Sequence, residues 1–150
     1  MYAFNGFTEK ANKVLNDAMQ IASELGHTYI GSEHILCALC GEETGVAGTL
    51  LNKHNITKQD VYHKLETVIG KGIPTRMSPA DFTPRSKRIL EMSIYEARNL
   101  KHTYVGTEHL LMAILRESDS YAVAFLQEFG VNIRDLYSEC INEVGEAGVS

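Results

Sequence analysis

Residues 27–34 read HTYIGSEH and residues 102–109 read HTYVGTEH, so one eight-residue stretch returns almost unchanged 75 positions later. The same offset holds without a gap across two longer copies, repeat one at 7–70 and repeat two at 82–145. Residues kept in both copies can be compared with residues that changed, which makes the duplication an internal control. The segment between the copies, 71–81, contains glycine and proline and little apolar content, so it is predicted to be a linker.

Each copy predicts four helices, because apolar residues recur at spacings of three and four and no stretch alternates as a half-buried strand would. Side chains that suit helix N-caps precede the expected helices at Thr8, Ser32, Thr57, Thr83, Thr107 and Asn132. A length of 150 residues fits one domain. The predicted fold class is all-α: a single domain over 1–150, with eight helices in two four-helix repeats related by a pseudo-two-fold axis.

Composition and charge exclude several classes of function. The formal net charge of −5 argues against a nucleic-acid-binding module, which would need a basic face. Residues 1–20 carry charges that interrupt any signal-peptide core, and no apolar run approaches the roughly 18 residues that cross a membrane. Three cysteines without framework spacing indicate reduced thiols. We therefore expect a soluble cytoplasmic protein, or a piece of one, with no nucleic-acid or membrane partner.

Cys37 and Cys40 form a C-x-x-C pattern, which raises the possibility of redox chemistry or metal binding. The second copy has Met112 and Leu115 at the corresponding positions. Apolar replacements at both positions indicate a need for hydrophobic volume, so these thiols are predicted to be buried and structural. Cys140, which matches a leucine in repeat one, is interpreted in the same way.

Four histidines, His27, His34, His102 and His109, are kept in both copies. A small metal-dependent hydrolase built on them is one alternative, but their spacing is not that of H-E-x-x-H and no third ligand is suggested. We expect them to pack at the helix starts and to bind backbone or neighbouring polar groups. The sequence also lacks a G-x-x-x-x-G-K-[ST] phosphate loop. It therefore predicts no catalytic residues, no metal and no cofactor in this chain.

Glu33 and Glu108 are also kept, each in the first turn of a helix that follows Gly31-Ser32 or Gly106-Thr107. One explanation is structural, because a first-turn acid stabilises the positive end of a helix by about 0.3–1 kcal/mol. The other is functional: the helix start offers N–H groups to an anion, and the carboxylate offers oxygens to a guanidinium. A ligand that joins a guanidinium to a negative group would use both, and two copies would bind flexible ligands with avidity.

The repeated Y-[IV]-G-[ST]-E-H-[IL]-L, preceded in each copy by F-T-x-[KR], resembles the double Clp repeat at the N-terminus of Clp/Hsp100 AAA+ unfoldases, most closely the ClpC type. The second copy opens with FTPRSK at 82–87. In the first copy, Gly45-Val46-Ala47 after Glu42-Glu43 also matches the family. The resemblance covers residues 1 to about 146.

The resemblance implies a recognition domain rather than an enzyme. ClpC-type domains dock adaptor proteins such as MecA and receive unfolded or phosphoarginine-marked substrates for AAA+ rings and a ClpP-type protease. ATP and Mg²⁺ are expected only in those rings, which lie outside this chain. The family associates the glutamate of each G-[ST]-E-H motif with phosphoarginine, which carries over to Glu33 and Glu108, beside Ser32 and Thr107. Adaptor docking alone, with both glutamates only capping, is the alternative within this class.

Two departures from the family pattern affect the turn after the second helix of each repeat. The glycine-containing turn of the family's second repeat is replaced by Arg116-Glu117-Ser118-Asp119-Ser120. In the first repeat, Cys40-Gly41 replaces a leucine or valine followed by a basic residue. We therefore expect these turns to be reshaped, and the two sites need not be equivalent.

Overall fold

The computed structural model describes residues 1–147, and over these residues the chain folds into helices joined by loops. It contains eight α-helices, a π-helical segment η1 and a short 3-10 helix η2, which confirms the predicted all-α class. In chain order the elements are α1 (Glu9–Glu24), α2 (Ser32–Gly41), α3 (Val46–Lys53), α4 (Lys58–Lys64), η1 (Leu65–Ile69), η2 (Pro79–Asp81), α5 (Pro84–Asn99), α6 (Thr107–Arg116), α7 (Tyr121–Glu128) and α8 (Ile133–Ala147). The segment predicted as a linker therefore includes η2.

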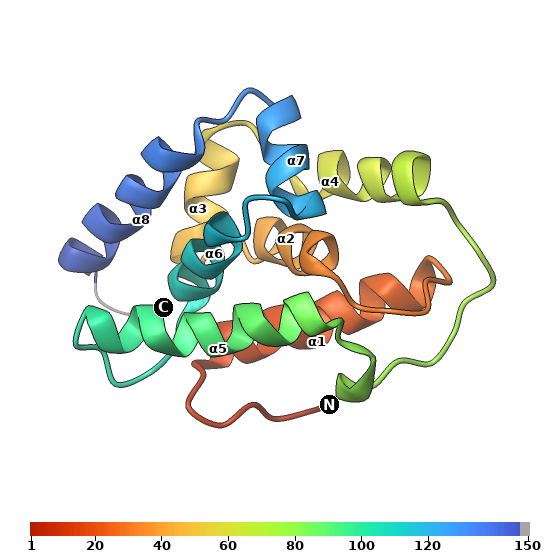
Figure 1. The fold of residues 1–150 in the computed structure, drawn as a ribbon, viewed down its shortest axis with the longest axis horizontal. Coiled ribbons are helices and arrows are strands. Elements are labelled where there is room, and N and C mark those ends of the chain that lie inside the picture. The colour runs from red at the N-terminus through yellow and green to blue at the C-terminus, as the bar shows by residue number, and fades with distance from the viewer. Residues whose placement is uncertain (148–150) are drawn as a thin grey trace.

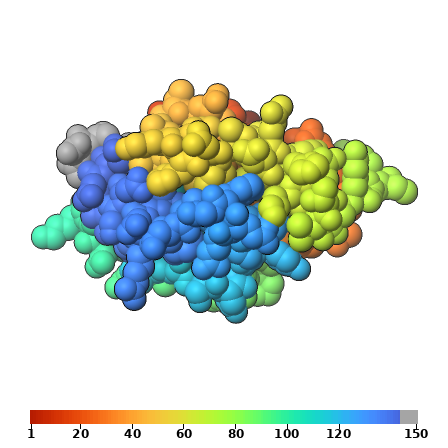
Figure 2. Space-filling model, turned by 90° about the horizontal axis from the view of Figure 1, so that it is seen from above, coloured from red at the N-terminus to blue at the C-terminus, as the bar shows by residue number. Residues whose placement is uncertain are grey.

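The two glutamate-bearing helices, α2 and α6, form the centre of the molecule (Figure 1). Nearly every residue of both helices is buried, from Ser32 to Cys40 in α2 and from Thr107 to Leu115 in α6. Helices that are apolar on all sides need other helices around them. Seen from above, α3 and α4 of repeat one lie against α7 and α8 of repeat two (Figure 2). The repeats thus interlock over one hydrophobic core.

Backbone pairing between the repeats follows the same pseudo-two-fold relation. Phe7 forms an isolated parallel bridge with Val105, and Ile30 forms the corresponding bridge with Phe82. The N–H of Thr8 donates to the carbonyl of Val105 at 2.9 Å, and the N–H of Thr83 donates to the carbonyl of Ile30 at 3.1 Å. The start of each repeat's first helix is therefore fixed to the segment that leads into the central helix of the other repeat.

Four of the six predicted N-caps are confirmed. The side chains of Thr8, Thr57, Thr83 and Asn132 accept hydrogen bonds from first-turn N–H groups of α1, α4, α5 and α8. The prediction was wrong for Ser32 and Thr107, which lie one position too late: the N-caps of α2 and α6 are Gly31 and Gly106.

The hydroxyls of Ser32 and Thr107 instead cap helices of the opposite repeat. Ser32 Oγ accepts the N–H of Ala122 in the first turn of α7 at 3.2 Å. Thr107 Oγ1 accepts the N–H of Ala47 in the first turn of α3 at 3.3 Å. Because these two bonds are equivalent under the 75-residue offset, each central helix stabilises the start of a helix in the other copy.

Candidate functional site

Glu33 lies in the first turn of α2, with only 2% of its surface exposed. The Tyr29 hydroxyl donates to Glu33 Oε2 at 3.0 Å, and the Ser32 hydroxyl lies 3.4 Å from Oε1. Burial is the main reason that the pKa of Tyr29 is raised, and the adjacent Glu33 charge adds to it. The tyrosine therefore stays protonated and acts as a donor to the carboxylate.

Gly31 provides the space that the Glu33 carboxylate occupies. A Cβ built on Gly31 would lie 2.4 Å from Glu33 Oε1, closer than atoms can approach without displacement. The Gly31 backbone is extended, with φ −103° and ψ −179°, a conformation that any residue adopts. A larger residue at position 31 would therefore displace the Glu33 carboxylate from its present position, although the dihedral angles would accept it.

The carboxylate of Glu33 borders a cavity of about 410 Å³ at the junction of the two repeats. Three segments meet there: the start of α2, the start of α5 and the turn between α6 and α7. The lining residues are Tyr29, Gly31, Ser32, Glu33, Thr83, Pro84, Arg85, Arg88, Asp119, Ser120 and Tyr121. We call this cavity the Glu33 pocket.

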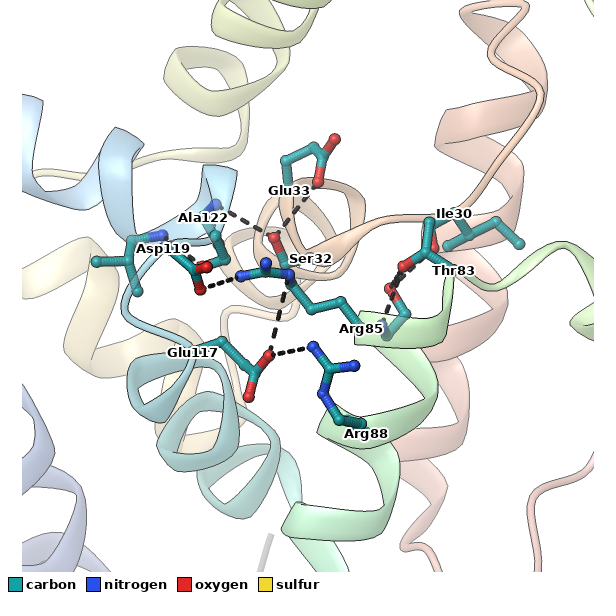
Figure 3. Close-up of polar contacts among 12 residues, drawn as sticks. Ile30, Ser32, Glu33, Thr83, Arg85, Arg88, Glu117, Asp119 and Ala122 are labelled. Carbon is teal, nitrogen blue, oxygen red and sulfur yellow. Dashed lines mark hydrogen bonds and ion pairs between the residues drawn. The ribbon is translucent and has the colours of Figure 1, made fainter.

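Both signs of charge line the Glu33 pocket (Figure 3). Arg85 Nη1 pairs with Asp119 Oδ1 at 2.6 Å, and Arg88 Nη2 pairs with Glu117 Oε1 at 3.2 Å. The hydrogen bond with Arg85 lowers the pKa of Asp119, so this carboxyl group is ionised at neutral pH. The pocket thus combines a buried carboxylate with two guanidinium groups, one held by the exposed Asp119 and one by the half-buried Glu117.

The surroundings of Glu108 differ from those of Glu33. Glu108 and Thr107 are both fully buried at the start of α6. Under the 75-residue offset, Lys10 and Lys13 stand where repeat two has Arg85 and Arg88. Lys10 Nζ donates to the Thr44 carbonyl at 3.1 Å, and Lys13 Nζ lies 3.7 Å from Glu42 Oε2. The expectation that the two sites need not be equivalent thus agrees with their different neighbours.

Sequence reasoning did not assign Arg85, Arg88 and Asp119 to the site. A signal for the arginines was present, because both copies carry basic residues at these positions, Lys10 with Arg85 and Lys13 with Arg88. Asp119 has Thr44 as its counterpart and therefore left no repeated signal.

The four histidines form two hydrogen-bonded chains at the starts of α2 and α6. The Gly31 N–H donates to His34 Nδ1 at 2.9 Å, which leaves the proton of a neutral His34 on Nε2. His34 Nε2 lies 2.7 Å from His27 Nδ1, and His27 Nε2 lies 2.8 Å from the Gly70 carbonyl. The second pair is equivalent: His102 Nδ1 lies 2.9 Å from His109 Nε2, and His109 Nδ1 accepts the Gly106 N–H at 2.8 Å. They therefore have the structural role expected of them.

These buried histidines predict a loss of stability in mild acid. Burial, and then the neighbouring histidine, lowers the pKa of His34 to about 3 and that of His109 to about 4. In the unfolded chain both pKa values are about 6.5. As the pH falls below about 6.5 the unfolded state therefore takes up protons that the folded state refuses, and the free energy of unfolding decreases.

We expect a decrease of about 1–2 kcal/mol per histidine between pH 7 and pH 5, measured by urea denaturation. In a His34→Gln/His109→Gln variant, the free energy of unfolding should change less between pH 7 and pH 5. A wild-type stability that does not change between pH 7 and pH 5 would contradict this assignment.

The three cysteines are buried free thiols, as predicted. Burial raises the pKa of Cys37 to about 12 and also raises that of Cys40. A thiol that stays protonated at neutral pH is a poor nucleophile. The C-x-x-C pattern is therefore explained by packing.

The described residues contain neither a metal-binding cluster nor a membrane-spanning helix. In that part of the chain, no group of three or more His, Cys, Asp or Glu side chains is placed to hold a metal ion. Over the same residues, no helix combines the length and the apolar character needed to cross a membrane.

Comparison with known proteins identifies related chains. The Clp repeat (R) N-terminal domain family matches residues 6–129 and 81–147. The chloroplastic chaperone protein ClpC1 of Oryza sativa subsp. japonica is 42% identical over 144 residues, which are 96% of this chain and 16% of that protein. The chain spans about a sixth of the length of the curated relatives it matches.

Two solved structures share the fold. The N-terminal domain of ClpD from Arabidopsis thaliana superposes with a TM-score of 0.80 at 20% identity, covering 96% of this chain and 97% of that one. A ClpV N-domain in complex with a VipB peptide superposes with a TM-score of 0.68 at 14% identity, covering 97% of this chain and 91% of that one.

Proposed function

The chain belongs to the Clp repeat (R) N-terminal domain family, and on that premise we propose that it is the recognition domain of a ClpC-type unfoldase and binds phosphoarginine through the Glu33 pocket. The observation that carries this proposal is a buried carboxylate and two guanidinium groups on one cavity of about 410 Å³. A phosphoarginine side chain carries the complementary charges, a guanidinium joined to a phosphate.

Glu33 is proposed to bind the guanidinium. Its carboxylate is held by the Tyr29 hydroxyl at 3.0 Å and needs little reorganisation to accept N–H donors. Charge-assisted hydrogen bonds of this kind are roughly twice as strong as neutral ones. The rings of Tyr29 and Tyr121, which also line the pocket, offer apolar faces to a planar cation.

Arg85 and Arg88 are proposed to bind the phosphate, together with the positive end of α2 at Gly31 and Ser32. Arginine matches phosphate oxygens through paired N–H donors, and a helix start favours an anion. The Ser32 hydroxyl already accepts the Ala122 N–H. We therefore assign the larger part of phosphate binding to the arginines.

Glu108 is proposed to form the second site with Gly106 and Thr107. Lys10 and Lys13 correspond to Arg85 and Arg88 under the offset, and a lysine binds phosphate as a point charge rather than through a fork. Because a lysine lacks the paired donors of an arginine, we expect weaker binding at Glu108 than at Glu33.

The partners proposed for the full-length protein are MecA-like adaptors, unfolded or phosphoarginine-bearing substrates, AAA+ rings and a ClpP-type protease. A relative's N-domain of the same fold has been solved with a VipB peptide, which supports peptide or protein docking as the general role. ATP and Mg²⁺ would act in the rings and not in this chain.

A ligand panel tests the proposed function. Isothermal titration calorimetry with phosphoarginine, arginine and inorganic phosphate is expected to detect phosphoarginine at least about tenfold more tightly than either part alone, because only the joined ligand uses both halves of the pocket. Equal binding of all three would contradict a dual-charge site. Adaptor binding without any phosphoarginine binding would favour the alternative, docking of adaptors alone.

A further inference from the structure

We infer that Asp119 is an internal competitor for the phosphate half of the Glu33 pocket, so that a ligand's phosphate must replace the Asp119 carboxylate on Arg85. This inference rests on the proposed function, because it concerns what regulates access to the same pocket.

The Asp119 carboxylate contacts Arg85 in the way that the phosphate of a bound ligand would. Asp119 Oδ1 lies 2.6 Å from Arg85 Nη1, a close charge-assisted contact of the kind that a guanidinium makes with a carboxylate or a phosphate. The two side chains come from separate segments, the start of α5 and the turn between α6 and α7, and meet across the pocket (Figure 3). The Asp119 carboxylate therefore occupies an N–H donor of Arg85 that a bound phosphate would need.

The exposure of Asp119 makes it displaceable. Its side chain is 82% exposed, whereas that of Arg85 is 29% exposed. Asp119 can rotate into water without losing buried contacts, while Arg85 stays in the pocket wall. Exposed ion pairs of this kind contribute little free energy. Asp119 therefore lowers the affinity for a phosphate-bearing ligand but does not prevent its binding.

The charges around the pocket indicate that Asp119 competes with an anionic ligand and does not help to bind it. Arg85 and Arg88 face three carboxylates, those of Glu33, Glu117 and Asp119. This excess of negative charge disfavours an anionic ligand. When Asp119 moves away, two guanidiniums face two carboxylates, and the balance suits a ligand that carries one guanidinium and one phosphate.

The competitor belongs to one repeat only. Thr44 corresponds to Asp119 under the 75-residue offset and has no negative charge, and there Lys10 donates to the Thr44 backbone carbonyl. Asp119 is therefore a specificity feature of the Glu33 pocket in this chain.

Calorimetry with phosphoarginine tests this inference in a Glu108→Gln background, which leaves the Glu33 pocket as the site measured. Adding Asp119→Asn is expected to tighten binding about two- to fivefold, the range set by an exposed ion pair. Glu43→Gln is the matched control: it makes an equal change in net charge on the corresponding turn of repeat one and should leave the affinity unchanged. The dissociation constants of the three proteins are compared at one salt concentration.

Unchanged or weaker binding with Asp119→Asn would overturn the inference, and weaker binding would mean that Asp119 helps to hold the guanidinium. In either case, binding by the Glu108→Gln protein itself would leave the proposed function standing. Absence of phosphoarginine binding in wild type and in every variant would instead reject the proposed function, and the inference with it.

Discussion

Replacing Glu33 and Glu108 together with glutamine is expected to abolish measurable phosphoarginine binding. Glutamine keeps the size of the side chain and an oxygen for the Tyr29 hydroxyl, but it removes the charge that attracts a guanidinium. A hydrogen bond to a charged group contributes about 1.5–3 kcal/mol, which corresponds to a loss of about ten- to a hundredfold in affinity at each site. Calorimetric titration of the purified domain measures this loss.

The single variants and the melting temperature are the controls. Glu33→Gln should remove the tighter of the two sites, and Glu108→Gln should leave it. Since a first-turn acid stabilises a helix by about 0.3–1 kcal/mol, each glutamine should lower the melting temperature by only a few degrees. Wild-type affinity in the folded double variant would show that the glutamates are helix-capping residues and not ligand-binding ones.

Replacing His34 with leucine is expected to have the largest effect on stability. The substitution leaves the buried Gly31 N–H and the Nδ1 of His27 without the partners that they have now at 2.9 and 2.7 Å. Each buried polar group left unsatisfied costs about 1–3 kcal/mol. The free energy of unfolding should therefore fall by about 2–6 kcal/mol, as measured by urea denaturation at pH 7.

His34→Gln separates the capping role from the volume of the ring. Glutamine at the third position of a helix forms a capping box with the N-cap N–H, so this variant should recover a substantial part of the stability lost in His34→Leu. His109→Leu and His109→Gln should behave in the same order, because His109 accepts the Gly106 N–H at 2.8 Å. Equal destabilisation by leucine and glutamine would contradict the capping role.

The sequence predicted the features that depend on local pattern. The number of α-helices followed from apolar spacing, and the caps at Thr8, Thr57, Thr83 and Asn132 followed from side chains close to the N–H groups they bind. The duplication added the role of the cysteines, since Met112 and Leu115 replace two of them.

The individual side-chain contacts between the two repeats were not predicted. Ser32 and Thr107 looked like local caps, but their hydroxyls bind helices that begin far away in the chain, at Tyr121 and Val46. The Glu33 pocket was missed for the same reason, because Arg85 and Asp119 reach Glu33 only after the repeats interlock. Sequence spacing carries no information about such contacts until the interface is known.

The most direct test of the central claim is a titration of the ¹⁵N-labelled wild-type domain with phosphoarginine, followed by NMR. A dual-charge site at the Glu33 pocket predicts saturable shifts in the backbone amides of Gly31, Ser32 and Glu33 and in the side-chain N–H signals of Arg85. Weaker shifts are predicted at Gly106, Thr107 and Glu108. Saturable shifts confined to other surfaces, with both G-[ST]-E segments unmoved, would contradict the account.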